Sequence, residues 1–158
     1  MPRKTASTSI KDKRTMDKVI KLLGVDYGEA RTGLARSDAL GLYAVGIGNI
    51  KSYHMEKTAA EIVRIAEKEG TERIVIGKPV NMNGTCGEKV EKVTELARLI
   101  SELSDIQVDF YDERLTTMSA HKILAESGVR AKNRREVVDS LAAELILQGY
   151  MDRNRKNS

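Results

Sequence analysis

Three groups of acidic residues stand where a carboxylate could do chemistry. Asp26 ends an apolar run that starts at Ile20, and Asp112 and Glu113 end a second, alternating run. Asp139 precedes small apolar residues at helical spacing. On a two-residue period Asp26 shares a strand face with apolar residues, where a lone charge is costly. Because clustered carboxylates repel one another unless a cation lies between them, the pattern predicts an acidic site that binds metal.

The donor atoms of the chain favour a hard metal ion. Two histidines and one cysteine do not supply the ligands of a usual zinc site. Carboxylate oxygens favour Mg²⁺ or Mn²⁺. Two such ions about 4 Å apart can activate a water and stabilise the leaving oxygen in phosphodiester cleavage. We therefore expect two Mg or Mn ions, held by Asp26, by Asp112 or Glu113, and by Asp139.

The elements that would position these acids can be predicted from periodicity and turn residues. Residues 20–26 form a run without alternation, typical of a central strand covered on both faces, and Gly28 and Gly33 bracket the turn after it. Gly46 and Gly48 indicate a bulge or a close backbone approach. We expect further strands at residues 32–36, 43–50, 72–77 and 106–111, and helices at residues 58–69, 85–103, 117–128 and 136–152, with Thr85 as an N-cap. This order predicts an α/β fold with a mixed five-stranded sheet, its first three strands antiparallel, flanked by helices.

The last predicted helix brings the third acid to the sheet. Asp139 is followed at helical spacing by Ala142, Ala143, Ile146 and Tyr150, so a small apolar face would lie close on the sheet with one carboxylate directed inward. The alternative is an acid of the N-terminal turn, favoured there by the helix dipole. The tips of strands at one edge of a parallel-rich sheet come together, which would gather all three acids.

Composition indicates one folded domain of a globular protein. We divide the 158 residues into a flexible basic extension at 1–17, a domain at 18–152 and a basic tail at 153–158. Residues 1–21 carry seven Lys or Arg against two Asp, a net charge of +5. Because the whole chain has a net charge of +4, the rest of it has a net charge of −1. No apolar run approaches the roughly 20 residues of a membrane helix, and the single Cys86 suits a reducing cytoplasm.

Several basic and polar residues are candidates for contact with a phosphate. Arg31 lies in the first turn and Arg114 follows the second acids, and both could bind a phosphate bidentately. Lys78 and Asn81 belong to a glycine-bearing loop that suits phosphate contact. The alternatives are an ion pair for Arg114 and a plain turn for the loop. Aromatic residues make up 4% and are not interleaved with the basic clusters at residues 130–135 and 153–156, so no stacking platform is predicted.

Four motifs, in order along the chain, resemble the YqgF/RuvX family of pre-16S rRNA nucleases. They are Leu23–Asp38, Ile74–Gly84, Asp112–Thr117 and Val138–Ala143, and together they extend over nearly all of residues 20–152. The family is related in fold to Holliday-junction resolvases and ribonuclease H. The resemblance implies a ribonuclease-H-like fold, a cytoplasmic location and a role in maturing the 5′ end of 16S rRNA.

The resemblance also implies a catalytic and metal-binding set of Asp26, Glu113 and Asp139. In the wider superfamily an acid commonly ends the fourth strand, where this chain has Gly77, so the second acid must come from the fifth strand. Asp112 and Glu113 point to opposite faces on simple alternation, and alternation alone leaves open which of them faces the site. We favour Glu113 on the resemblance.

The function expected from these observations is a metal-dependent endonuclease acting on precursor 16S rRNA. One alternative is a Holliday-junction resolvase acting on branched DNA, which would favour a homodimer over a monomer. Another is an rRNA-binding assembly factor without turnover, although such a module has no need of inward carboxylates. The region around Asp26 also resembles the phosphate loop of actin-like and hexokinase-like ATPases, but that fold generally needs two such domains. The sequence leaves the natural substrate and the cleavage position open.

Overall fold

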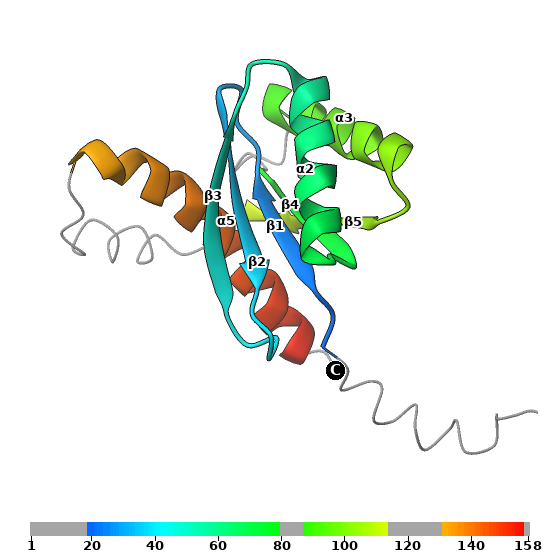
Figure 1. Cartoon of the computed structure of the whole chain (residues 1–158), viewed down its shortest axis with the longest axis vertical. Coiled ribbons are helices and arrows are strands. Elements are labelled where there is room, and N and C mark those ends of the chain that lie inside the picture. The colour runs from blue at the N-terminus through cyan, green and yellow to red at the C-terminus, as the bar shows by residue number, and fades with distance from the viewer. Residues whose placement is uncertain (1–18, 80–86, 114–130, 157–158) are drawn as a thin grey trace, which may run out of the picture.

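Five strands form one mixed sheet in the order β3-β2-β1-β4-β5 (Figure 1). The computed structural model describes residues 19–79, 87–113 and 131–156, with the side chains of residues 140–155 in the last range. The antiparallel pairs are β1 with β2 and β2 with β3, and the parallel pairs are β1 with β4 and β4 with β5. The elements are β1 (Leu22–Asp26), β2 (Arg31–Ser37), β3 (Ala44–Lys51), α2 (Met55–Glu69), β4 (Arg73–Lys78), α3 (Glu88–Leu103), β5 (Gln107–Asp112) and α5 (Ala131–Lys156). The predicted mixed sheet with three leading antiparallel strands is confirmed.

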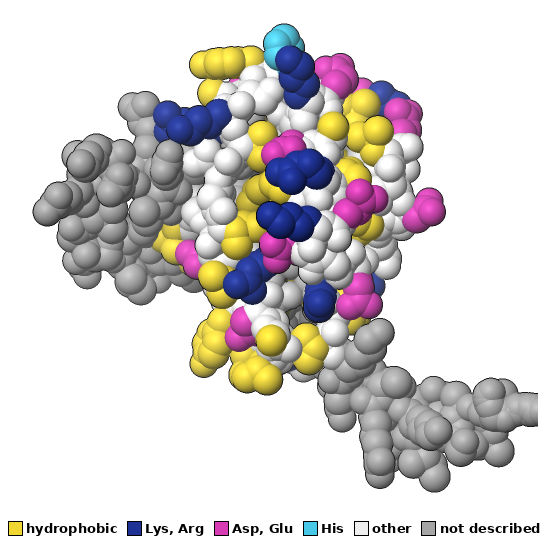
Figure 2. Space-filling view, viewed as in Figure 1, with side chains coloured by type: hydrophobic (Ala, Val, Ile, Leu, Met, Phe, Trp, Pro, Cys, Tyr) yellow, Lys and Arg dark blue, Asp and Glu magenta, His cyan; other side chains and the backbone are white. Residues whose placement is uncertain are grey.

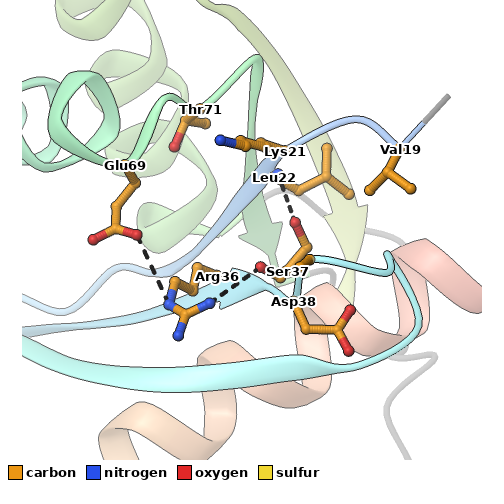
Figure 3. A pocket seen from close by; sticks show the side chains of 9 residues that line it. Val19, Lys21, Leu22, Arg36, Ser37, Asp38, Glu69 and Thr71 are labelled. Atoms are coloured by element: carbon orange, nitrogen blue, oxygen red, sulfur yellow. Dashed lines mark hydrogen bonds and ion pairs between the residues drawn. The ribbon is translucent and has the colours of Figure 1, made fainter.

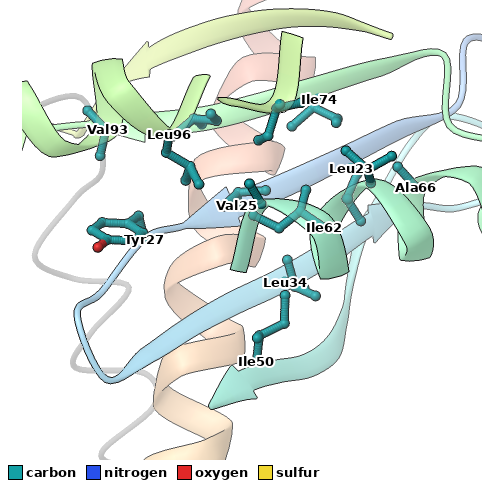
Figure 4. Packing of buried hydrophobic residues seen from close by; sticks show 14 residues of the cluster. Leu23, Val25, Tyr27, Leu34, Ile50, Ile62, Ala66, Ile74, Val93 and Leu96 are labelled. Atoms are coloured by element: carbon teal, nitrogen blue, oxygen red, sulfur yellow. The ribbon is translucent and has the colours of Figure 1, made fainter. Parts of the chain in front are cut away.

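Helices cover both faces of the sheet. Helices α2 and α3 pack on one face, where Leu23 and Val25 of β1 meet Ile62 of α2 and Leu96 of α3 (Figure 4). Helix α5 packs on the other face, in a second cluster that includes Ala35, Val75, Tyr111, Ala143, Ile146, Leu147 and Tyr150. Burial on both faces explains why β1 reads as an apolar run without alternation.

Helix α5 approaches the sheet closely because glycines lie beneath it. A Cβ at Gly24 would lie 2.8 Å from the Cβ of Leu147 and 3.1 Å from the carbonyl oxygen of Ala143. A Cβ at Gly46 would collide with the hydroxyl of Ser140. The close backbone approach expected at Gly46 is therefore confirmed, and the ladder between β2 and β3 has an irregularity next to it.

Side chains of α5 also cover the open edge of β3. The Oε1 atom of Gln148 accepts a 2.8 Å bond from the backbone N–H of Ala44, and its Nε2 donates a 2.9 Å bond to the carbonyl of Leu42. One turn earlier, Oε1 of Glu144 accepts a 2.9 Å bond from the N–H of Gly46. The later residue of α5 contacts the earlier residue of β3, so α5 runs antiparallel to β3. Since β1 runs in the same direction as β3, α5 is also antiparallel to β1, as Figure 1 shows.

The helix ends differ from those predicted. Helix α5 extends over residues 131–156 instead of 136–152, so the boundary predicted after residue 152 falls inside it. Its exposed last turn carries an ion pair between Arg155 and Asp152 and lacks the apolar periodicity that marks a helix in a sequence. Helix α3 begins at Glu88 with Gly87 as its N-cap, so the predicted cap at Thr85 is wrong. Helix α2 begins at Met55, three residues before the predicted start, and its mostly exposed first turn carries no apolar pattern that could have predicted it. The extension at 1–17 and the helix predicted at 117–128 lie outside the described residues. Among the described residues, no helix is long and apolar enough to span a membrane.

Candidate active site

Asp26 ends β1 on the face that α5 covers. It pairs in register with Gly33 of β2 and follows Val25, which pairs with Ile76 of β4, so Asp26 is level with Gly77 on the neighbouring strand. Two residues earlier on the same strand face, Gly24 touches α5. The predicted position of Asp26, at the tip of a central strand and on an otherwise apolar face, is confirmed.

Glu113 reaches the same face from β5. Its Oε1 atom lies 2.8 Å, and its Cγ atom 3.1 Å, from the position that a Cβ would take at Gly77. The side chain of Ile146 from α5 contacts that same position, so the Glu113 carboxylate lies on the α5 face of β4. Neighbouring strands are about 4.8 Å apart. Asp26 and Glu113 therefore approach one another at one end of the sheet and on one face of it.

Asp112 lies on the opposite face. Tyr111, which precedes it, is buried against α5 and touches Gly149, whereas Phe110 faces the other way. Asp112 pairs in register with Lys78, whose Nζ lies 5.2 Å from the centre of the Phe110 ring. Alternation along β5 thus turns Asp112 away from Asp26, and the contact over Gly77 places Glu113, the residue after β5, on the face of Asp26.

The backbone of α5 brings the third acid toward the same end of the sheet. Asp139 is the ninth residue of a helix that begins at Ala131, so it lies beyond the first turn and the dipole of the N-terminus does not explain it. It precedes Ala143 by one turn, and the carbonyl of Ala143 lies against Gly24. Since α5 runs opposite to β1, residues before Ala143 lie toward the end that carries Asp26. The side chain of Asp139 is outside the described residues.

The residues predicted to bind phosphate fall in three places. Arg31 lies two positions before Gly33, which is opposite Asp26 in the ladder between β1 and β2, so strand alternation puts Arg31 on the α5 face with the acids. In the ladder between β2 and β3, Arg31 is opposite Lys51. Lys78 ends β4 at the same sheet end but on the opposite face, over Phe110. Asn81 and Arg114 lie outside the described residues.

The turn that follows Asp26 is held by contacts that the sequence did not predict. Glu29 forms an ion pair with Lys92 of α3, and Lys92 also lies 3.4 Å from Glu88. Tyr27 is buried in the core beside α3, and burial raises the pKa of its hydroxyl. A side chain at Gly28 would collide with the carbonyl of Arg31, so glycine is required there. An ion pair between distant residues has no local sequence signal, which is why the role of Lys92 was missed.

A separate pocket lies at the other end of the sheet. It has a volume of about 250 Å³ and surrounds the start of β1 (Figure 3). Ser37 accepts a 2.8 Å bond from the N–H of Leu22 there, and Arg36 lies 3.8 Å from Glu69. The pocket lies at the start of β1 and Asp26 lies at its end. The pocket is therefore not part of the acidic site.

The described side chains fit part of a site for a hard metal ion. Asp26 and Glu113 supply carboxylate oxygens on one face, which are the ligands that Mg²⁺ and Mn²⁺ prefer. Among residues 19–79, 87–113 and 140–155 no three His, Cys, Asp or Glu side chains form a group that could hold a metal. A third carboxylate, if it joins these two, must come from a residue such as Asp139, beyond the described side chains.

Comparison with known proteins gives the family. A family model described as RuvX, Holliday junction resolvase, matches residues 20–153. The chain belongs to the RuvX family. A relative in Clostridium botulinum (strain Eklund 17B / Type B), named "Putative pre-16S rRNA nuclease", is 43% identical over 137 residues, which are 87% of this chain and 100% of the relative. A relative of the same name in Ruminiclostridium cellulolyticum is 42% identical over 135 residues, 85% of this chain and 95% of the relative.

Solved structures confirm the fold of this RuvX family member. The Thermus thermophilus RuvC in complex with a Holliday junction substrate matches with a TM-score of 0.57 and 13% identity, over 85% of this chain and 96% of RuvC. A second structure of Thermus thermophilus RuvC matches with a TM-score of 0.50 and 16% identity, over 85% and 97%. At such identities the likeness concerns the fold, and it agrees with the ribonuclease-H-like sheet expected from the sequence.

Proposed function

We propose that this RuvX family protein is a metal-dependent endonuclease that processes the 5′ end of precursor 16S rRNA. The observation that carries the proposal is the approach of two carboxylates from different strands: Asp26 is level with Gly77, and Glu113 lies over that glycine. Two carboxylates on one face supply the oxygen ligands that a divalent cation prefers, and a bound cation would lower the repulsion between them. The names of the relatives at 43% and 42% identity support precursor 16S rRNA as the substrate.

Each residue has a defined task in this proposal. Asp26 and Glu113, joined by Asp139, would hold one or two Mg or Mn ions. Such ions supply a nucleophilic water at neutral pH and stabilise charge on the leaving oxygen. Arg31, on the same face, would bind the scissile phosphate and orient it toward the acids. The tie between Glu29 and Lys92 would keep the turn after Asp26 in place while the substrate binds.

We place the protein in the cytoplasm. Precursor rRNA is the proposed substrate, and its maturation takes place there. The single Cys86 is consistent with a reducing compartment.

Cleavage assays with matched variants test the proposal. The substrates are a precursor-16S 5′ fragment and a four-way DNA junction, each in Mg²⁺, Mn²⁺ or EDTA. Asp26→Asn removes the central carboxylate, and Asp105→Asn, an exposed acid that precedes β5 at the other end of the sheet, is the control. We expect the RNA to be cut in either metal and not in EDTA, by the wild type and by Asp105→Asn but not by Asp26→Asn. RNA that is bound and never cut would contradict the proposal and favour an assembly factor.

A Holliday-junction resolvase is the second candidate function. The description of the matching family model and the fold of RuvC, solved with a junction, favour it. Both candidates use the same acids, so only the substrate separates them. Cleavage of the DNA junction without cleavage of the RNA fragment would establish this alternative.

A further inference from the structure

Two cations face each other across the strands beside the acidic site. Arg31 of β2 and Lys51 of β3 pair in register, so their side chains leave the same face of the sheet. Strand alternation makes this the face of Asp26 and α5. Lys51 is exposed there and Arg31 is half-buried, so both place positive charge beside the acids.

An exposed aromatic ring lies in the loop that follows Lys51. Tyr53 follows Lys51 by two residues and is 83% exposed, more than any other large hydrophobic side chain that the structure describes. Its loop is fixed in place, because the N–H of Ser52 donates a 3.1 Å bond to the carbonyl of Ala30 in the turn after β1. The hydroxyl of Ser52 also accepts a 3.1 Å bond from the N–H of His54. The exposure of the ring therefore belongs to an ordered loop.

The loop that carries Tyr53 lies at the same end of the sheet as Asp26. β3 and β1 are both antiparallel to β2, so they run in the same direction, and Lys51 and Asp26 are their last residues. In Figure 1 the turn after β1 and the connection from β3 to α2 both lie at the upper end of the molecule. Figure 2 shows hydrophobic, basic and acidic side chains and a histidine at that end. Two strand spacings, roughly 10 Å, separate β3 from β1.

An exposed ring beside cations is the combination that binds single-stranded nucleic acid. The cations contact the backbone, and each unpaired base can stack on an aromatic side chain whatever its sequence. Recognition of RNA relies on such unstacked bases, because side chains cannot read the deep, narrow major groove of its duplex. A paired stretch of RNA would leave Tyr53 without a base to stack on.

We infer that Arg31, Lys51 and Tyr53 form a contact for an unpaired stretch of RNA beside the scissile phosphate, with one base stacked on the Tyr53 ring. The inference rests on the proposed function, since it takes RNA as the substrate of the acidic site. It adds that the enzyme distinguishes single-stranded flanking RNA from a blunt duplex. Tyr53 is a substrate-binding residue in this account and has no part in the chemical step.

Binding measurements in EDTA test this contact without cleavage. One probe is an RNA hairpin with a single-stranded 5′ extension that carries 2-aminopurine, and the other is the same hairpin without the extension. Tyr53→Ala removes the ring and Tyr53→Phe keeps it. Tyr43→Ala is the matched control, because Tyr43 is 65% exposed and precedes the same strand, β3, at the end away from Asp26.

For Tyr53→Ala we expect about tenfold weaker binding of the extended hairpin and loss of the 2-aminopurine quenching. Tyr53→Phe and Tyr43→Ala should bind it like the wild type, and all four proteins should bind the blunt hairpin equally. Lys51→Gln should reduce the slope of log K against log salt by roughly 0.7, the value for one phosphate contact with a single strand.

The outcomes separate this inference from the proposed function. If the wild type binds and cuts RNA while Tyr53→Ala binds the extended hairpin equally well and keeps the quenching, the inference is wrong and the nuclease proposal stands. Equal losses for Tyr53→Ala and Tyr43→Ala would also overturn it, because the contact would not be local to the acidic end. If the wild type neither binds nor cuts RNA, the proposed function fails and the inference fails with it.

Discussion

The Glu113 carboxylate lies over Gly77, with its Oε1 atom 2.8 Å from the position that a Cβ would take at that glycine. Gly77 is level with Asp26 on the next strand, so an acid from β5 extends across β4 toward β1. A side chain at position 77 would displace the ends of Glu113 and Ile146, so the glycine leaves open the space that the carboxylate occupies. The absence of an acid at the end of β4 and the presence of one after β5 are thus two parts of one arrangement.

Gly77→Ala should reduce cleavage by on the order of 100-fold, because a misplaced catalytic group of this kind costs about that factor. The added methyl group would meet both Glu113 and Ile146, so a loss of about 1–3 kcal/mol in the free energy of unfolding is also expected. Single-turnover cleavage of the RNA fragment measures the first effect, and urea unfolding measures the second.

A second substitution separates the two effects of Gly77→Ala. Adding Ile146→Val removes the methyl group that meets position 77 from α5 and leaves Glu113 displaced. The double variant should therefore regain part of the stability without regaining cleavage. Recovery of cleavage together with stability would show that Gly77 matters only for packing.

Gly24→Ala should loosen α5 from the sheet. Its Cβ would lie 2.8 Å from that of Leu147 and 3.1 Å from the carbonyl of Ala143, and these atoms cannot move without the helix. We expect the free energy of unfolding to fall by about 1–3 kcal/mol. Cleavage should also fall, since α5 carries Asp139. Unchanged urea unfolding would contradict the close packing of α5 on β1.

Gln148 and Glu144 should keep the β3 edge from pairing with other chains. Replacing both with Ala leaves the N–H groups of Ala44 and Gly46 without these acceptors, at about 0.5–1.5 kcal/mol for each lost hydrogen bond. An edge strand that loses its cover pairs with other strands, so light scattering should show more association for the double variant. Glu95→Ala, which removes an exposed ion pair of α3, is the control and should change neither property.

Asp38 should make stability fall in acid. Partial desolvation alone would raise the pKa of its carboxyl, but backbone N–H groups of Leu42, Tyr43, Gly41 and Leu40 together hold that pKa below its usual value. A lowered pKa contributes stability above the unfolded-state value near 4, and this contribution is lost as pH falls through the folded-state value. Urea unfolding at pH 7 and pH 3 should therefore show a smaller acid loss for Asp38→Asn than for the wild type. Equal losses would contradict the effect of these N–H groups.

The sequence predicted the sheet and the first acid because both leave a local pattern. The buried β1 strand appears in the sequence as an apolar run, and Asp26 is the one charged residue at its end. The acid after β5 could not be chosen from the sequence, because alternation says that Asp112 and Glu113 face opposite ways but not which way. That choice depends on Tyr111, which packs under α5, a helix far along the chain.

Features that depend on exposed residues, or on residues far apart in the chain, could not be predicted from sequence patterns. The ends of α5 and the start of α2 are polar, so their periodicity gave no apolar signal, and both helices are longer than predicted. Lys78 was expected in a loop that contacts phosphate, yet it is the last residue of β4 and lies over Phe110 on the face opposite the acids. The ring of Tyr53 acquires its context only when β2 and β3 pair and set Lys51 opposite Arg31.

The most direct test of the site compares two adjacent acids of nearly the same chemistry. Glu113→Gln and Asp112→Asn each remove one charge with little change in volume, and Mn²⁺-dependent cleavage of the precursor-16S 5′ fragment is the measurement. If Glu113 and Asp26 hold the same ion, Glu113→Gln abolishes cleavage, Asp112→Asn retains most of it, and adding Asp26→Asn to Glu113→Gln costs little more. Loss of cleavage in Asp112→Asn with an active Glu113→Gln would contradict the site described for this protein.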